Sequence, residues 1–74
     1  MPTFLFRAVN AKTDQPVKVH ITLAGVARGF TPDRSNQYLE VTLSTTGTYS
    51  WYAKQNGSVV RTGESKGGEI VVAV

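Results

Sequence analysis

Apolar and polar residues alternate along most of the chain, and this pattern predicts β-strands throughout. The clearest case is the stretch 17–23, VKVHITL, in which every second residue is valine, isoleucine or leucine. Alternate side chains of a strand point to opposite faces, so this segment has an apolar face and a polar face, and we expect His20 to be solvent-exposed on the polar one. Alternation and β-branched or aromatic enrichment predict seven strands: residues 3–9, 17–23, 26–30, 38–43, 48–54, 58–62 and 69–74. No stretch has a helical period, so the predicted fold class is all-β.

Turn-forming residues separate these strands. Clusters of Asn, Asp, Gly, Pro and Ser occupy residues 10–16, 31–37 and 44–47, and residues 63–68, GESKGG, predict a mobile loop. The strongest turn is Asn56-Gly57, because a two-residue type I′ hairpin needs positive φ at both positions.

The Asn56-Gly57 turn also predicts the pairing of the two strands that it joins. Counting outward from the turn places Lys54 opposite Val59, Ala53 opposite Val60, Tyr52 opposite Arg61 and Trp51 opposite Thr62. Directly opposed residues share a face of the sheet. Trp51, Ala53 and Val60 are therefore expected in the core, and Tyr52 and Arg61 are expected to form an exposed cation–π pair.

Apolar positions on one face of each strand define the expected core. These positions are Phe4, Phe6, Ala8, Val17, Val19, Ile21, Leu23, Leu39, Val41, Leu43, Tyr49, Trp51, Ala53 and Val60. Short strands at intervals of about ten residues are typical of all-β sandwiches and barrels. We therefore predict that residues 1–74 form one small antiparallel β-sandwich of about seven strands, with a small β-barrel as the alternative.

The segment Leu43–Tyr49, LSTTGTY, resembles the entry to the sixth strand of immunoglobulin-like and fibronectin-type sandwiches. In those families a Gly-x-Tyr element places a tyrosine whose hydroxyl bonds to upstream backbone, and Gly47-Thr48-Tyr49 matches it. The following SWYAKQNG is similar to the strand and hairpin that come next in bacterial immunoglobulin-like modules. The chain departs from the family in having no cysteine pair and in carrying its one tryptophan, Trp51, at the position of the sixth strand.

A second stretch, PVKVHITLAGVARGFTP, is similar to the opening hairpin of PEGA-type and carboxypeptidase-regulatory-like sandwiches. The similarity lies in Pro16-Val17 before an alternating strand and in Gly29-x-Thr31-Pro32 after it. Both resemblances imply a sandwich fold and a non-catalytic adhesion, spacer or interaction module. Neither implies a particular binding site.

Charge and chemistry exclude several classes of site. The net charge is +3, all of it contributed by residues 1–37, and the chain has no cysteine, one histidine and five scattered carboxylates. This set contains no metal-ligand spacing, no nucleophile with a base, and no phosphate-binding glycine motif. We expect no catalytic site, no metal and no cofactor. The longest apolar run, Ile70–Val74, is far shorter than the roughly 20 residues that span a bilayer, so no membrane insertion is expected, and no signal peptide is recognisable.

Two functions remain compatible with these observations. The first is a structural or protein-interaction module, for example in a surface, pilus or phage or virion assembly. It would act through the strand Glu69–Val74 or through the turn-rich end Arg28–Asn36. The terminal strand is apolar on both faces, which favours a central position in a sheet. An edge position would instead offer strand addition to a partner or to a second copy.

The second function is binding of single-stranded nucleic acid or another polyanion, since small β-folds bind such ligands with exposed aromatic and basic residues. Phe30, beside Pro32, is expected to pack over one end of the sandwich. For either function, the candidate binding residues are Arg28, Phe30, Arg34, Tyr52 and Arg61.

Overall fold

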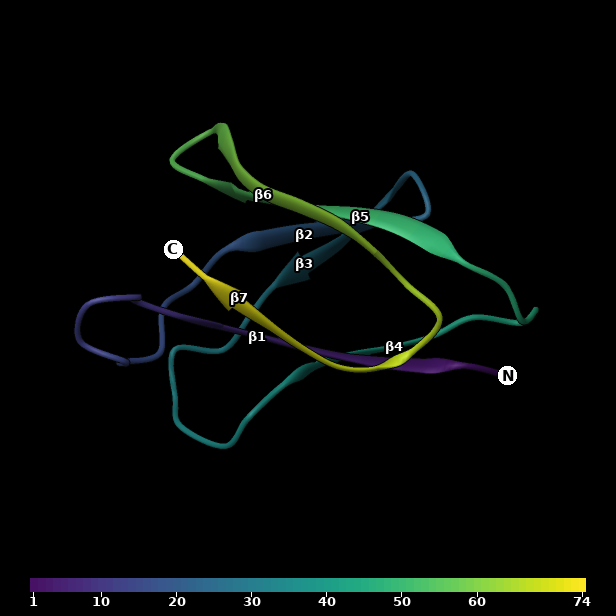
Figure 1. Cartoon of the computed structure of the whole chain (residues 1–74), viewed down its shortest axis with the longest axis horizontal. Coiled ribbons are helices and arrows are strands. Elements are labelled where there is room, and N and C mark those ends of the chain that lie inside the picture. Colours follow the sequence, from purple (N-terminus) through teal and green to yellow (C-terminus); the bar gives the residue numbers. More distant parts are fainter.

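The computed structural model describes all residues, 1–74, and folds them into two layers of β-strands without a helix (Figure 1). The strands are β1 (Thr3–Val9), β2 (His20–Leu23), β3 (Val26–Phe30), β4 (Leu39–Thr42), β5 (Tyr49–Gln55), β6 (Ser58–Ser65) and β7 (Gly68–Ala73). The predicted all-β fold with seven strands is confirmed, and most strand ends lie within three residues of the predicted ones.

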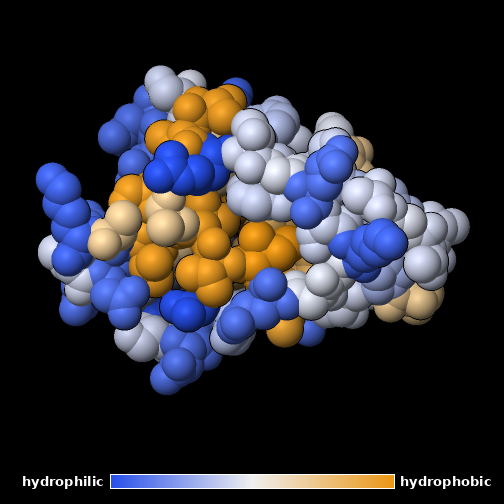
Figure 2. Space-filling model, viewed as in Figure 1, coloured by the Kyte–Doolittle hydropathy of each residue, from blue (hydrophilic) through white to orange (hydrophobic).

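The strands form two sheets that face each other. One has the order β4-β1-β7 and the other β3-β2-β5-β6. All strand pairs are antiparallel except β1 with β7, which is parallel. No ladder joins β3 to β4 or β6 to β7, so the fold is a sandwich and not the alternative closed barrel. Apolar side chains gather on the side of the molecule where β6 and β7 lie (Figure 2).

The core lies between the sheets and contains most of the residues expected there. Phe4, Phe6 and Ala8 from β1 meet the inner face of the other sheet, and all three are buried. The ring of Tyr49 stands edge-on to Phe4 at 6.1 Å between centroids, and that of Trp51 stands edge-on to Phe6 at 5.8 Å. Edge-to-face pairs at such distances add about 0.5–1.5 kcal/mol each beyond their burial. Two buried phenylalanines therefore lie in the core, and the half-buried Tyr49 and Trp51 pack against them.

The predicted strand at residues 17–23 is paired only from His20 onward. Its first half is held by Thr31, whose buried hydroxyl accepts a hydrogen bond from the Val19 amide and donates one to the Val17 carbonyl, both at 3.0 Å. The Thr31 amide completes the contact by donating to the Val19 carbonyl at 2.9 Å. A loop threonine thus replaces a neighbouring strand, and nothing in the local sequence distinguishes it from an exposed turn residue.

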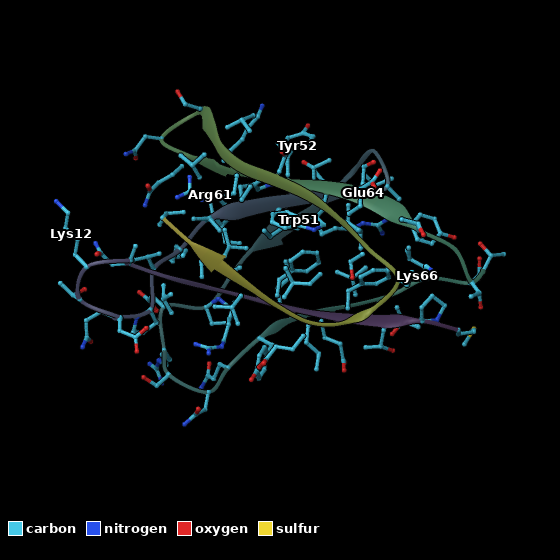
Figure 3. All side chains as sticks on the ribbon, in the orientation of Figure 1. Lys12, Trp51, Tyr52, Arg61, Glu64 and Lys66 are labelled. Atoms are coloured by element: carbon cyan, nitrogen blue, oxygen red, sulfur yellow. The ribbon has the colours of Figure 1, made fainter.

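The hairpin at Asn56-Gly57 is confirmed, with φ of 53° and 80° at the two turn residues. Lys54 lies opposite Val59 as predicted, but the register then shifts. A β-bulge places Arg61 opposite Ala53 and Thr62 opposite Tyr52, so the predicted Tyr52–Arg61 pair is wrong. The extra residue in β6 moves every later partner by one position. Trp51 still points between the sheets and Tyr52 outward (Figure 3).

The predicted mobile loop at residues 63–68 is wrong for its first half, because β6 continues to Ser65. Gly63 lies opposite Trp51, and a Cβ placed on Gly63 would approach the indole Cζ2 to 2.7 Å. The missing side chain lets the tryptophan ring lie against the β6 backbone. Glycine here serves close packing within a strand and does not mark a loop.

Replacing Thr31 tests its contacts with the segment before β2. Thr31→Val keeps the shape but leaves the buried Val19 amide and the Val17 carbonyl without their partner. We expect the free energy of unfolding to fall by about 1–3 kcal/mol in urea titrations. Thr31→Ser keeps the hydroxyl and should lose only about 1 kcal/mol. Equal losses in both variants would contradict the role given to the hydroxyl.

Replacing Gly63 tests the packing of Trp51. Gly63→Ala forces the indole or the β6 backbone to move, and we expect a loss of about 1–3 kcal/mol in the free energy of unfolding. The matched control is Gly47→Ala, since its Cβ would lie 3.7 Å from the Tyr49 ring, an ordinary contact. If the control loses as much stability as Gly63→Ala, the close approach of Trp51 is not the cause.

Candidate functional site

The five residues predicted to bind a ligand do not form one site. The guanidinium of Arg28 donates two hydrogen bonds, of 3.2 and 3.0 Å, to the Leu23 carbonyl, and thereby braces the hairpin between β2 and β3. Arg34 is exposed in the loop before β4. Arg61 lies on the edge strand β6 and donates to the Val60 carbonyl. The three arginines therefore lie in three separate places.

Phe30 and Tyr52 lie on one surface without touching, the outer face of the sheet β3-β2-β5-β6. His20 of β2 pairs with Phe30 on one side and with Lys54 on the other, and the neighbouring Thr22 pairs with Tyr52. Phe30 does not pack over the end of the sandwich as expected: 59% of it is exposed, because its strand places it on the outer surface of the sheet.

Basic side chains accompany these rings. The Lys18 ammonium lies 5.7 Å from the centre of the Phe30 ring, and that of Lys54 lies 5.7 Å from the Tyr52 ring. His20, half-buried and not fully exposed as expected, stands edge-on to Phe30 with 5.1 Å between ring centres. We call this surface the aromatic–basic face; it consists of Lys18, His20, Phe30, Tyr52 and Lys54.

Local sequence patterns did not predict Lys18, His20 and Lys54 as partners of the two aromatic residues. Alternation already placed Lys18 and His20 on one face of a strand. Recognising the surface also required the order β3-β2-β5, which brings Phe30 and Lys54 to either side of His20. Strand order depends on long-range contacts and is not written in any local pattern.

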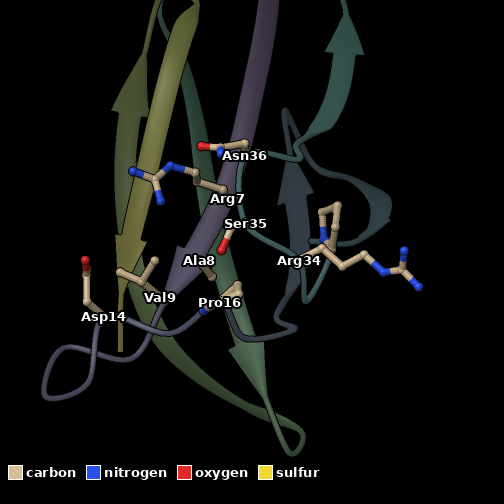
Figure 4. A pocket seen from close by; sticks show the side chains of 9 residues that line it. Arg7, Ala8, Val9, Asp14, Pro16, Arg34, Ser35 and Asn36 are labelled. Carbon is tan, nitrogen blue, oxygen red and sulfur yellow. The ribbon is translucent and has the colours of Figure 1, made fainter.

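The turn-rich end predicted at Arg28–Asn36 contributes to a small pocket of about 260 Å³. Its lining residues are Arg7, Ala8, Val9, Asp14, Pro16, Pro32, Arg34, Ser35 and Asn36. The side chain of Arg34 extends away from the hollow, and that of Arg7 is directed toward β7 (Figure 4). Ligand pockets are usually larger and mostly apolar, with convergent polar groups. This pocket is smaller than that, and only two of its nine lining residues are hydrophobic.

The terminal strand is an edge strand, so the central position that its sequence favoured is wrong. β7 pairs with β1 on one side, and no strand pairs with its other side. The amide of Val74 donates to Val9 and its carbonyl accepts from Ala11, so the Val74 backbone is directed toward β1. Backbone groups alternate in direction along a strand. Those of Glu69, Val71 and Ala73 consequently point to the free edge.

Polar contacts on the outer face of the sheet β4-β1-β7 hold the beginning of β7. The Tyr38 hydroxyl donates a hydrogen bond to the Glu69 carboxylate, and the Arg7 guanidinium lies 3.8 Å from the same carboxylate. The bond to Glu69 raises the pKa of Tyr38 above 10.0; desolvation and the negative charge of Glu69 add to the effect, and Arg7 opposes it. Arg7 of β1, Glu69 of β7 and Tyr38, which directly precedes β4, are thereby linked.

Some kinds of site have no counterpart in the structure. No group of three His, Cys, Asp or Glu residues is placed so that it could hold a metal ion. No helix has the length and apolarity needed to cross a membrane. The two surfaces that could bind a ligand or a partner are the aromatic–basic face and the free edge of β7.

The Tyr38–Glu69 contact predicts a shifted titration. Glu69→Ala should return the pKa of Tyr38 toward 10.0, and Arg7→Ala should raise it further, because each removes an opposite influence. The stability that the bond contributes is present below pH 10 and is lost as pH rises through the raised pKa. NMR of the Tyr38 Cζ during an alkaline titration measures the pKa. Shifts of the same sign in both variants would contradict the assignment.

Comparison with protein-family models, with curated proteins and with solved structures gives no match for this chain. The hydrogen bond expected from the resemblance to immunoglobulin-like sandwiches is nevertheless present: the Tyr49 hydroxyl donates to the Thr45 carbonyl at 2.8 Å. This contact is a local feature and does not establish a family. What the structure itself shows is a small all-β sandwich of two sheets.

Proposed function

We propose that this protein is a non-enzymatic interaction module that associates with a second copy of itself by pairing β7 with β7. The observation that carries the proposal is the free edge at Val71, whose amide and carbonyl are directed away from β1. Unpaired edge groups are a template for another strand, since strand addition supplies main-chain hydrogen bonds and side-chain contacts together.

The edge lacks the features that usually prevent such pairing. Natural edge strands carry lysine, proline or a bulge. Residues 70–74, IVVAV, contain none of the charged or proline residues, and β7 pairs with β1 without a bulge. The one charged residue of the strand, Glu69, is engaged by Tyr38 and Arg7. The rest of the edge is therefore open to another apolar strand.

An antiparallel pair centred on Val71 satisfies both backbone and side chains. Val71 then faces its own copy, Glu69 faces Ala73, and these are the residues whose backbone groups point outward. Ile70 of one molecule faces Val72 of the other on the core side, so the apolar side chains of the two cores contact each other across the paired strands. No like charges are opposed, which removes a common cost of self-pairing.

Apolar side chains beside the edge add to the contact. Val71 is 44% exposed, and the half-buried Val60, Ile70 and Val74 pack against the margin of the core. Exposed apolar patches mark interaction surfaces more often than scattered single residues do. The apolar area on the β6 and β7 side supports this surface as the one that meets the second copy (Figure 2).

The resemblance to interaction modules supports the same class of function. The Tyr49 hydroxyl donates to the Thr45 carbonyl, which is the hydrogen bond that this resemblance implies. The Tyr49 ring lies against Gly47. The immunoglobulin-like and the PEGA-type sandwiches, which the sequence resembles, consist mainly of binding and spacer modules. We accordingly propose an immunoglobulin-like sandwich specialised for association and without catalysis.

Replacing Val71 tests the proposal. Val71→Lys places two ammonium groups directly opposite each other in the paired strands and should weaken the dimer at least tenfold, while the exposed position leaves the fold intact. Sedimentation velocity over a range of concentrations measures the association, with circular dichroism as the check on folding. We expect the wild-type chain to approach twice its 8.0 kDa mass.

The matched control is Val71→Thr, which keeps a β-branched side chain and adds no charge. It should associate nearly as well as the wild type. A wild-type chain that stays monomeric up to millimolar concentration, or a Val71→Lys variant that associates as well as Val71→Thr, would contradict pairing through this edge.

A further inference from the structure

The aromatic–basic face is a second surface, on the other sheet, and it is not used in the proposed pairing of β7. We propose that it binds single-stranded nucleic acid, with bases stacked on Phe30 and Tyr52 and phosphates at Lys18 and Lys54. The proposal rests on exposure, charge and spacing on this face. It does not depend on the self-association through β7, and each proposal can fail without the other.

The exposure of Phe30 is the first observation. Phenylalanine has no polar group, yet 59% of this residue is in contact with solvent, at the end of the edge strand β3. Its only ring partner, His20, meets it edge-on with an interplanar angle of 75°. No ring stacks parallel on Phe30, and a nucleobase is a ligand that covers an exposed aromatic ring by stacking.

The charge of the face is the second observation. Lys18 and Lys54 each lie near an aromatic ring, and no aspartate or glutamate occurs in β2, β3 or β5. The one carboxylate of this sheet, Glu64, pairs with Ser50, beyond Tyr52 and away from the lysines. Neither lysine forms an ion pair. Two unpaired cations beside two rings match the alternation of phosphate and base along a single strand.

The spacing is the third observation. Phe30 and Lys54 are on either side of His20, two strand spacings or about 10 Å apart. Tyr52 lies one repeat of two residues, about 7 Å, further along β5. Four-stranded sheets that stack two or three bases on exposed rings are an established mode of single-strand recognition. The face has room for a short segment of this kind, and its mixed chemistry suits a base-bearing polyanion better than one without bases.

Binding is measured by fluorescence anisotropy with a labelled oligothymidylate of about 12 nucleotides, a length within the usual range for small β-domains. We expect saturable binding at low salt. The slope of log K against log salt should be about −1.4, because two lysines neutralise two phosphates. No binding at low salt would overturn the proposal.

Two matched pairs of variants test the individual roles. Phe30→Ala should weaken binding about tenfold. Val26 is also exposed, at 51%, but pairs with the inward-facing Leu23, so Val26→Ala should leave binding unchanged. Lys54→Ala should weaken binding several-fold, whereas Arg61→Ala removes the same charge outside the face and should have a smaller effect.

Inorganic polyphosphate, as competitor, separates the stacking of bases from attraction of charge alone. It should displace the oligonucleotide poorly at equal phosphate concentration. Equal displacement together with an unchanged affinity of Phe30→Ala would overturn base stacking, and equal losses in Lys54→Ala and Arg61→Ala would overturn the location. Chemical-shift changes confined to Lys18, His20, Phe30, Tyr52 and Lys54 would support both.

Discussion

The parallel pairing of β1 with β7 is the contact on which the rest of this structure depends. It joins the two ends of the chain through hydrogen bonds that continue past the strands, from Val74 to Val9 at 2.9 Å and from Ala11 to Val74 at 2.8 Å. Without β7, β1 would have β4 as its one neighbour, and two-stranded sheets are marginally stable in water. β7 also brings Val72 into the core beside Phe6 and Ala8. A chain without cysteine has no disulfide to replace this contact.

The same pairing separates the two surfaces with functional potential. Because β7 lies at the end of its sheet, the apolar strand that completes the core also presents an unpaired edge. The aromatic–basic face lies on the outer surface of the other sheet. Association through one sheet thus leaves the other free, and a dimer would carry two copies of the aromatic–basic face. Two copies on one particle would raise the avidity for a long polyanion.

Local patterns predicted much of the fold. Alternation identified the inward residues of β1, β4 and β5, and the Asn56-Gly57 pair identified the hairpin, because strand periodicity and turn geometry depend on neighbouring residues. The bulge at Val60 in β6 could not be predicted, since it depends on how β6 fits the rest of the sheet. Gly63 looked like loop sequence, and only the Trp51 ring above it explains its place in a strand.

The candidate sites were harder to predict than the strands. Phe30 and Tyr52 were identified as candidates, but their shared face depends on the order of β3, β2 and β5. Arg28 is of a residue type that often binds ligands, but its role here is structural, because its guanidinium donates hydrogen bonds to the Leu23 carbonyl. The terminal strand reads as a central one because apolar residues on both faces suit either a covered strand or an edge that meets a partner. Hydrophobicity alone does not separate these cases.

Amide hydrogen exchange along β7 tests the central claim most directly. In dilute solution, the amides of Ile70, Val72 and Val74 should be protected by β1, and those of Glu69, Val71 and Ala73 should exchange quickly. Raising the protein concentration should protect the second group as the edges pair. Uniform protection of all six amides in the monomer would contradict an edge position, and fast exchange of all six would contradict the pairing with β1.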